Sequence, residues 1–264
     1  MKWVLKILTP TNLIGRQDVN LPLICLKTYS LFSNNAIIKI NNDCRKLIIM
    51  FERVTKRESR IARERVAAII LKIQKILRDK YTFTYRLVGS AKWGTIIKDD
   101  SGKYDLDYQL LLTSKSKEFK ANKLSNPTMI KNDFYGAFSK ALDQSERIEN
   151  STTAITLYNN SKPFSVDFVI IKLFPENNQI IRRNNKSKSS VNECTWNELP
   201  RMSEAYKKFR KLKPDVKQYL IEKIIIPKKC IEKSKNDNDF TKISSSELFV
   251  REVNNYCDNK RKDC

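Results

Sequence analysis

The spacing of apolar residues changes along this chain, and each spacing predicts a different kind of element. From Arg45 to Lys80, apolar residues recur every three or four positions between lysines and arginines, which predicts a long amphipathic helix. The segment Phe83–Val88, rich in aromatic and aliphatic residues, predicts a strand. Residues 127–148 predict a second helix, and residues 154–158 and 164–171 predict two strands joined by a polar turn.

The C-terminal third of the chain is predicted to be helical. The segment WNELPRMSEAYKKFRKLKPDVKQYLIEKIII predicts two helices separated near Pro214, and residues 244–256 predict a third. A polar tract after Ile181 predicts an exposed loop. The side chains expected to pack these helices together are Trp196, Leu199, Tyr206 and Phe209.

Three segments follow from this pattern. Residues 1–44 mix short apolar runs with turn signals and show no period, so this N-terminal extension receives no function. Residues 45–182 contain the long helix and the predicted strands and form the expected core. Residues 183–264 form a short helical lobe with a basic tail. A chain of 264 residues is long enough for one domain with an appended lobe, or for two small domains.

Glycine is rare in this sequence, but it is concentrated after the first predicted strand. Three of the five glycines, Gly89, Gly94 and Gly102, fall within fourteen residues. Glycine lets main-chain amides approach a phosphate closely, and Ser90 can donate from its hydroxyl and its amide. Lys92 can add a point charge, although such a lysine is more commonly just exposed. The Gly89-Ser90 loop is therefore a candidate triphosphate site.

Acidic residues interrupt two of the predicted strands. Asp105 and Asp107 lie in YDLDYQLLL, and both point to the same side because successive side chains of a strand alternate between faces. Asp167 interrupts the apolar run 164–171, which is expected to be buried on both faces. An aspartate in such a strand is costly unless its charge is matched.

Each of these acidic residues also has a purely structural explanation. An Asp-x-Asp pair commonly lies on the solvated face of an edge strand, and Asp167 could pair with a buried lysine. Asp99 and Asp100 precede Ser101 and Gly102 and are interpreted as turn formers.

Three converging carboxylates predict a divalent cation site. Like charges repel unless a cation lies between them, and oxygen-only ligands suit Mg²⁺ or Mn²⁺. A pair of such ions can activate a hydroxyl and neutralise a leaving pyrophosphate. The residues assigned as catalytic and as metal ligands are Asp105, Asp107 and Asp167. The residues assigned to the triphosphate are Gly89, Ser90 and Lys92.

Composition narrows the chemistry. The chain has no histidine, which excludes Ser-His and Cys-His nucleophile pairs and His-ligated zinc. Its net charge of +22 attracts polyanions such as nucleoside triphosphates, RNA or DNA, although an A+T-rich genome would also yield a chain rich in Lys, Asn and Ile. Six scattered cysteines without Cys-x-x-Cys spacing indicate reduced thiols. No segment reaches membrane-spanning length, so we expect a cytoplasmic protein without membrane contact, and its oligomeric state is open.

The order of these motifs resembles the nucleotidyltransferases of the DNA polymerase β superfamily. Gly89-Ser90, then Asp105-Leu106-Asp107, then Asp167 follow in the order of that signature, each with apolar flanks. Within the superfamily, GSAKWGT, DLDYQL and VDFVII are most similar to the cGAS/DncV-like group, over about residues 80–175. The resemblance implies an α+β fold, with a polymerase β-like core of a mixed sheet flanked by helices and a short helical C-terminal lobe.

The resemblance also implies roles for the helical lobe. In this group the lobe closes over the nucleotide and offers a lysine to the triphosphate and an aromatic ring to the base. The candidates in this sequence are Tyr206, Lys207 and Lys208. In proteins such an aromatic residue more often packs in the core, and such lysines more often face solvent.

The function implied is that of a Mg²⁺-dependent nucleotidyltransferase with nucleoside triphosphate donors. The product expected from the resemblance is an oligonucleotide or cyclic nucleotide second messenger, with a role in antiphage defence. A helical lobe of about eighty residues is short for this group, which leaves transfer of a single nucleotide to a small molecule, a protein or an RNA end as an alternative. A second alternative is a catalytically inactive sensor that binds nucleic acid through a basic surface.

Overall fold

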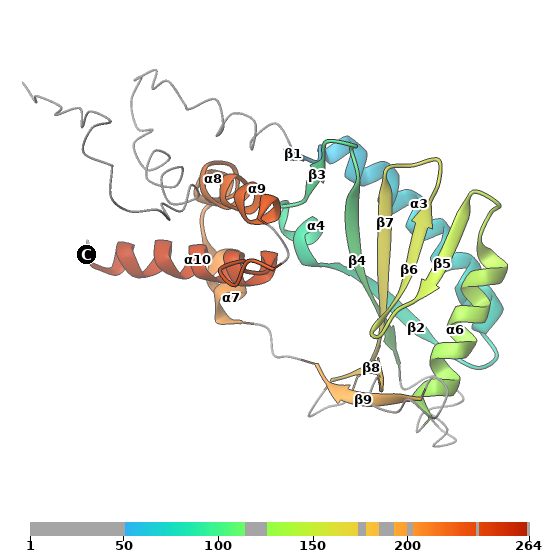
Figure 1. Ribbon diagram of the computed structural model, residues 1–264. Coiled ribbons are helices and arrows are strands. Elements are labelled where there is room, and N and C mark those ends of the chain that lie inside the picture. Colours follow the sequence, from blue (N-terminus) through green and yellow to red (C-terminus); the bar gives the residue numbers. More distant parts are fainter. Residues whose placement is uncertain are drawn as a thin grey trace, which may run out of the picture. The chain divides into compact units, whose positions relative to one another are not determined.

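The computed structural model describes residues 51–113, 126–173, 178–184, 193–199, 203–235 and 238–262, and the structural statements below refer to these residues (Figure 1). All of them belong to the larger of two compact units, Leu47–Cys264. The N-terminal extension predicted over residues 1–44 lies outside the described residues.

A mixed sheet forms the centre of the described chain. β4 and β7 are parallel neighbours, and the other neighbouring strands run antiparallel. The strands of the main path, in spatial order, are β2 (Phe83–Val88), β4 (Tyr104–Leu112), β7 (Phe164–Lys172), β6 (Ala154–Asn159) and β5 (Glu146–Asn150). The predicted strands that begin at residues 83, 104, 154 and 164 are confirmed.

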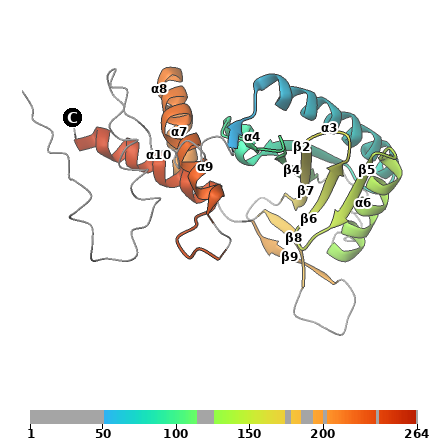
Figure 2. The same cartoon turned by 45° about the horizontal axis from the view of Figure 1, so that its top comes forward.

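Two helices cover one face of this sheet. α3 (Lys56–Leu77) and α6 (Pro127–Ala141) lie on the same side of the strands in both views (Figures 1 and 2). Phe138 of α6 lies 4.6 Å from Phe168 of β7, measured between ring centroids. On β4 the residues facing these helices are buried, and the two aspartates alternate with them. The acidic residues therefore lie on the opposite face, which α3 and α6 leave uncovered.

The long helix begins later than the sequence pattern predicts. Among the described residues, Phe51–Arg53 form β1, which pairs with β3 (Ile97–Asp99) in a separate two-stranded sheet. Thr55 then caps α3, because its hydroxyl accepts from the Glu58 amide at 3.1 Å while the Glu58 carboxylate accepts from the Thr55 amide at 2.7 Å. The prediction of helix across residues 51–53 is therefore wrong.

The second predicted helix is too long at its other end. α6 ends at Ala141, and residues 146–148, predicted as helix, belong to β5 (Glu146–Asn150). The side chain of Glu146 is fully buried and binds Arg65 of α3, with Arg65 Nε donating to Glu146 Oε1 at 2.9 Å. This ion pair fixes the start of β5 against α3, and tertiary contacts of this kind are invisible to a helical period.

The sheet extends further along the chain than predicted. β8 (Gln179–Arg183) pairs with the end of β7, and β9 (Cys194–Glu198) pairs with β8. The sheet-bearing core therefore reaches Glu198, and its boundary with the helical lobe does not fall between residues 182 and 183. Trp196, expected in a helix, lies on β9 and packs against the core. Most of the predicted loop, residues 185–192, lies outside the described residues.

The helical lobe confirms the predicted break at Pro214 and the predicted C-terminal helix. Its described segments are α7 (Glu204–Lys211), α8 (Pro214–Tyr219), the π-helical η3 (Leu220–Ile225), α9 (Ile226–Ser234) and α10 (Ser245–Lys262). Phe209 and Phe249 lie in the centre of its apolar cluster. Trp93 of the short core helix α4 (Gly89–Trp93) packs into this cluster, with ring centroids 5.1 Å from Tyr206. No helix in the described part of the chain is long and apolar enough to cross a membrane.

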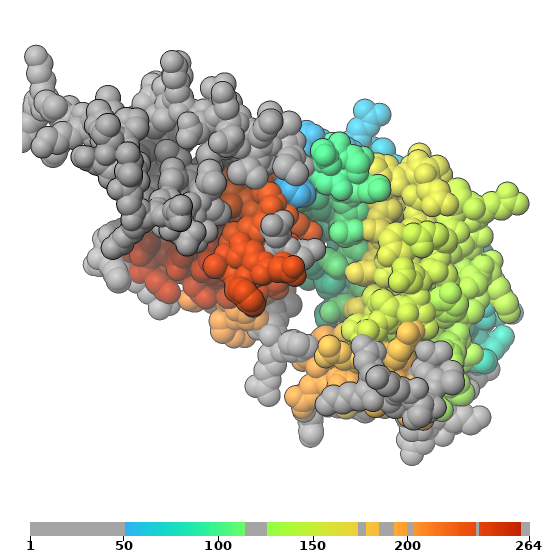
Figure 3. All heavy atoms as spheres, in the orientation of Figure 1, coloured from blue at the N-terminus to red at the C-terminus, as the bar shows by residue number. Residues whose placement is uncertain are grey.

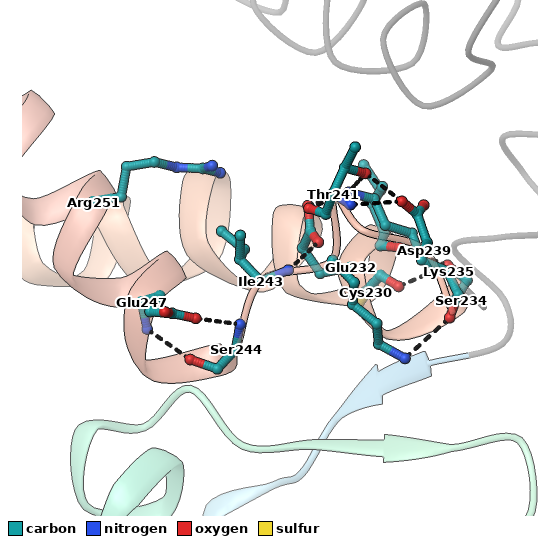
Figure 4. Close-up of polar contacts among 12 residues, drawn as sticks. Cys230, Glu232, Ser234, Lys235, Asp239, Thr241, Ile243, Ser244, Glu247 and Arg251 are labelled. Atoms are coloured by element: carbon teal, nitrogen blue, oxygen red, sulfur yellow. Dashed lines mark hydrogen bonds and ion pairs between the residues drawn. The ribbon is translucent and has the colours of Figure 1, made fainter. Parts of the chain in front are cut away.

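Polar side chains fix the connection between α9 and α10 (Figure 4). Lys235 Nζ donates to Glu232 Oε1 at 2.9 Å, and Glu232 Oε2 accepts from the Ile243 amide at 3.1 Å. Ser244 and Glu247 cap α10 reciprocally, at 2.8 and 3.2 Å. Hydrogen bonds at the end of α9 therefore fix the connection that leads into α10.

Candidate active site

The register of the sheet brings the three predicted aspartates together. In the parallel pairing of β4 with β7, Asp107 lies opposite Asp167, and Asp105 lies opposite Ser165. Residues paired across neighbouring strands point to the same face. The three carboxylates therefore share the open face of the sheet. The expectation that β7 is buried on both faces is wrong at this level, where Asp167 is only half-buried.

Neighbouring hydroxyls hold two of these carboxylates. Ser165 Oγ donates to Asp105 Oδ1, and Thr156 Oγ1 of β6 donates to Asp167 Oδ1 at 2.6 Å. As the side chains stand, no three Asp, Glu, Cys or His side chains in the described part of the chain lie close enough to ligate one metal ion. A common ion would require the three carboxylates to come closer together than they stand here.

The environment of Asp107 disfavours its charged form. Burial raises the pKa of Asp107, and repulsion from Asp167 and then from Asp105 raises it further. Lys229 and Lys233 of α9 oppose this rise. A carboxylate in this position is stabilised by an added cation.

Gly89 ends β2 directly beside Asp107. Val88 is the Cα partner of Asp107, and the chain then turns at Gly89 with a φ of 61°. A Cβ on Gly89 would overlap the Asp107 carboxylate, since it would lie 2.9 Å from Cγ and closer still to Oδ2. Glycine is needed here both for its backbone conformation and for the space it leaves.

A lysine of the helical lobe binds the predicted triphosphate loop. Lys229 is 5% exposed, and its Nζ donates to Ser90 Oγ at 2.7 Å and to the carbonyl oxygen of Thr95 at 3.0 Å. Burial, followed by repulsion from Lys233, lowers the pKa of Lys229 to about 8, and attraction to Asp107 opposes this shift. The contact places a cation from α9 within the Gly-Ser loop.

Sequence reasoning did not find Lys229 or Lys233. The two lysines are four residues apart on one face of α9, in a tract rich in lysine. The same spacing is usual for lysines that face solvent, so the pattern carries no distinguishing signal.

Lys92, the predicted triphosphate lysine, lies on α4 two residues after Ser90. Its side chain is exposed, and Nζ lies 5.4 Å from the centroid of the Trp93 ring. Burial, and then repulsion from Arg210 and Arg86, lowers the pKa of Lys92. The structure thus places Lys92 beside other cations.

The candidates predicted in the helical lobe have structural partners. The ring of Tyr206 stacks on Phe249 with centroids 5.0 Å apart. Lys207 pairs with Glu204 at 2.7 Å, and Lys208 Nζ donates to a side chain of α10 at 2.9 Å. These contacts agree with the interpretation of a packed aromatic residue and surface lysines, and it is Lys229 that contacts the Gly-Ser loop.

The first of two hollows around the carboxylates lies at Asp105. Its volume is about 790 Å³, and Lys233 of α9 lines it together with residues of the sheet. Figure 3 shows the surface open between the sheet (green to yellow) and the helical lobe (orange to red). The basic side chains that line the hollow are Lys103, Arg147, Lys162 and Lys233.

The second hollow lies at Asp107 and Asp167, and its volume is about 550 Å³. Gly89 lines it, and so does the connection between β5 and β6, residues 151–153. The apolar residues beside the carboxylates are Val88, Ala154 and Val169. This hollow combines two carboxylates, an apolar surface and hydroxyl-bearing residues.

No family model and no curated protein matches this sequence. Solved structures do match. The STING-associated CdnE c-di-GMP synthase of Capnocytophaga granulosa aligns at 22% identity and a TM-score of 0.56, over 87% of this chain and 69% of that one. The DncV cyclic AMP-GMP synthase of Vibrio cholerae aligns at 11% identity and a TM-score of 0.58, over 76% of this chain and 67% of that one. The chain has the fold of the cGAS/DncV-like nucleotidyltransferases.

The cGAS/DncV-like nucleotidyltransferases are also called CD-NTases. Their fold confirms the resemblance predicted from the motifs. A third similar structure is the CD-NTase CdnG of Bradyrhizobium diazoefficiens in complex with GTP, with 16% identity and a TM-score of 0.44 over 63% of this chain. The chain spans 45% of the length of CdnG, and about two thirds of the length of the other two.

Proposed function

We propose that this protein is a nucleoside triphosphate-dependent nucleotidyltransferase whose reaction takes place at Asp105, Asp107 and Asp167. The observation that supports this most strongly is the register of β4 and β7, which gathers three carboxylates on one open face beside Gly89. The CD-NTase fold supports the same proposal. A nucleic-acid sensor would not require three aligned carboxylates.

The carboxylates fit a divalent cation in their chemistry. They supply oxygen donors only, as Mg²⁺ and Mn²⁺ prefer, and the crowding around Asp107 is relieved by added positive charge. Asp105, Asp107 and Asp167 would hold the metal. When bound, it supplies Lewis-acid activation of the attacking hydroxyl and neutralises charge on the leaving pyrophosphate.

The chain's own residues bind and orient the donor. Ser90 and the amides of its loop receive the triphosphate, and Lys229 and Lys233 add positive charge from the side of α9. In the reaction the acceptor hydroxyl oxygen forms a bond to the α-phosphorus. The bond from that phosphorus to the β-phosphate oxygen breaks, pyrophosphate leaves with the electron pair, and the hydroxyl proton passes to a carboxylate or to water.

We assign the acceptor to the second hollow. Asp167 lines it, and the apolar surface of Val88, Ala154 and Val169 suits the face of a nucleobase. With a nucleotide as acceptor, the product is an oligonucleotide or a cyclic dinucleotide. The names of the similar CdnE and DncV structures state a cyclic dinucleotide for those proteins. A part in antiphage defence rests on the family resemblance alone.

Incubation of the full chain with labelled ATP, GTP, CTP and UTP and Mg²⁺ tests this proposal. Labelled phosphodiester product formed from the nucleotides alone supports it. Label transferred only to an added small molecule, protein or RNA supports the single-nucleotide alternative. Tight, salt-sensitive RNA binding with no turnover under any combination of nucleotides contradicts the enzymatic proposal.

A further inference from the structure

A buried lysine that the proposed reaction does not use lies behind the second hollow. Lys131 of α6 is 1% exposed, and its Nζ donates to the carbonyl oxygens of Ser151 at 2.6 Å and Thr152 at 3.2 Å. Among the described residues no carboxylate forms an ion pair with it. Burying a cation without a carboxylate partner lowers the stability of the fold. A lysine at this position therefore indicates a role for its hydrogen bonds to the two carbonyls.

Arg183 of β8 holds the same segment from another direction. Its guanidinium donates to the carbonyl oxygen of Asn150 at 2.7 Å, and its amide donates to that of Thr152 at 2.7 Å. Three consecutive carbonyls, at residues 150–152, are thus bound by residues of α6 and β8. Surface connections are generally more mobile than the elements that they join, so these bonds restrict the main chain of this one.

The fixed segment is the wall of the second hollow. Residues 151–153 line that hollow together with Asp107 and Asp167. The same connection leads into β6, where Thr156 donates to Asp167 at 2.6 Å. The position of this turn therefore determines the shape of the space next to Asp167. Thr153 is the last of the three hydroxyl-bearing residues in this segment, and it is half-buried.

We propose that Lys131 is a positioning residue for the acceptor nucleotide. It fixes the connection between β5 and β6 so that Thr153 contacts the polar edge of the acceptor base while the apolar surface beside Asp167 contacts its face. An apolar side chain at position 131 would fill the same space without binding the carbonyls of Ser151 and Thr152. This inference rests on the proposed function and adds to it the element that selects the acceptor.

Single-bond synthesis tests the inference with two nucleotides that cannot exchange roles. The donor is a 2′,3′-dideoxynucleoside triphosphate, which lacks an attacking hydroxyl. The acceptor is a ribonucleoside triphosphate with an α,β-methylene bridge, which cannot release pyrophosphate. The initial rate of joining is measured against the concentration of each, for wild type, Lys131→Met, Thr153→Val and the control Lys140→Met. Lys140 is exposed on the same helix, so it undergoes the same change without contacting the turn.

The inference predicts that Lys131→Met and Thr153→Val each raise the KM of the acceptor about tenfold or more, while the KM of the donor changes less than about twofold. Lys140→Met is expected to match wild type. Because Thr153 is half-buried and lies outside the hydrophobic core, its variant remains informative if Lys131→Met does not fold. Two results would overturn the inference and leave the proposed function intact, provided that wild type turns over. One is an unchanged acceptor KM in both variants. The other is a loss of kcat alone that parallels the loss of stability. An inactive wild type would instead contradict the proposed function.

Discussion

The carboxylate of Asp107 occupies the space that a side chain at position 89 would need. Gly89 has a φ of 61°, and an added Cβ would overlap Asp107 Oδ2. The end of β2 and the acidic strand β4 are therefore matched through the absence of one side chain. Since Ser90 follows directly, the same contact sets the distance between the triphosphate loop and the carboxylates.

Gly89→Ala is expected to reduce turnover by at least about a hundredfold, because Asp107 must move or the loop must turn away. The strained backbone also predicts a loss of about 1–3 kcal/mol in the free energy of unfolding. Initial rates and thermal unfolding measure the two effects. The control is Gly136→Ala, in the helix α6, where an added Cβ meets nothing within 4 Å. The Gly136→Ala variant is expected to gain up to about 1 kcal/mol in the free energy of unfolding and to keep full activity.

Lys229→Met is expected to raise the KM for the donor triphosphate about tenfold or more, since it removes a buried positive charge beside Ser90. The matched control is Lys223→Met, at an exposed lysine of the same helical run. Titration with a nonhydrolysable triphosphate measures the affinity directly. An unchanged affinity in Lys229→Met would show that the lysine only joins the lobes.

Trp93→Ala is expected to loosen the helical lobe. The indole packs against Tyr206, Phe209 and Phe249, with centroids 5.1, 5.9 and 5.8 Å away, so its removal leaves a cavity between the core and the lobe. We expect a loss of about 3 kcal/mol in the free energy of unfolding, and less than about 1.5 kcal/mol for Trp93→Phe. Denaturant unfolding measures both. Equal stability of wild type and Trp93→Ala would contradict this packing role.

The stability conferred by position 131 is expected to depend on pH. Burial lowers the pKa of Lys131 to about 8, whereas an unfolded lysine titrates near 10.5. Between these values the unfolded chain binds more protons at this site than the folded chain does, so this lysine's contribution to the stability of the fold rises with pH. The difference in unfolding free energy between wild type and Lys131→Met is expected to shift in favour of wild type by up to about 3 kcal/mol from pH 8 to 10.5. A flat difference over this range would show that Lys131 keeps an ordinary pKa.

The parts of the site that depend on local pattern were predictable, and the parts that depend on packing were not. Strand alternation places Asp105 and Asp107 on one face, and the Gly89-Ser90 loop follows the end of a predicted strand. Lys229 was not found because lysines four residues apart look alike whether they face solvent or a loop. The short strands β1, β8 and β9 were missed for a related reason, since three to five residues are too few to show a period.

The central claim is that three aspartates of neighbouring strands act on one bound metal centre. Mn²⁺ binding, followed by its electron paramagnetic resonance signal, and nucleotide turnover should be measured together for wild type, Asp107→Asn, Asp167→Asn and the control Asp100→Asn in the exposed turn. We predict that each site variant loses Mn²⁺ affinity and at least about a hundredfold in rate, while the control matches wild type. Full Mn²⁺ binding and full turnover in Asp107→Asn or Asp167→Asn would contradict the account.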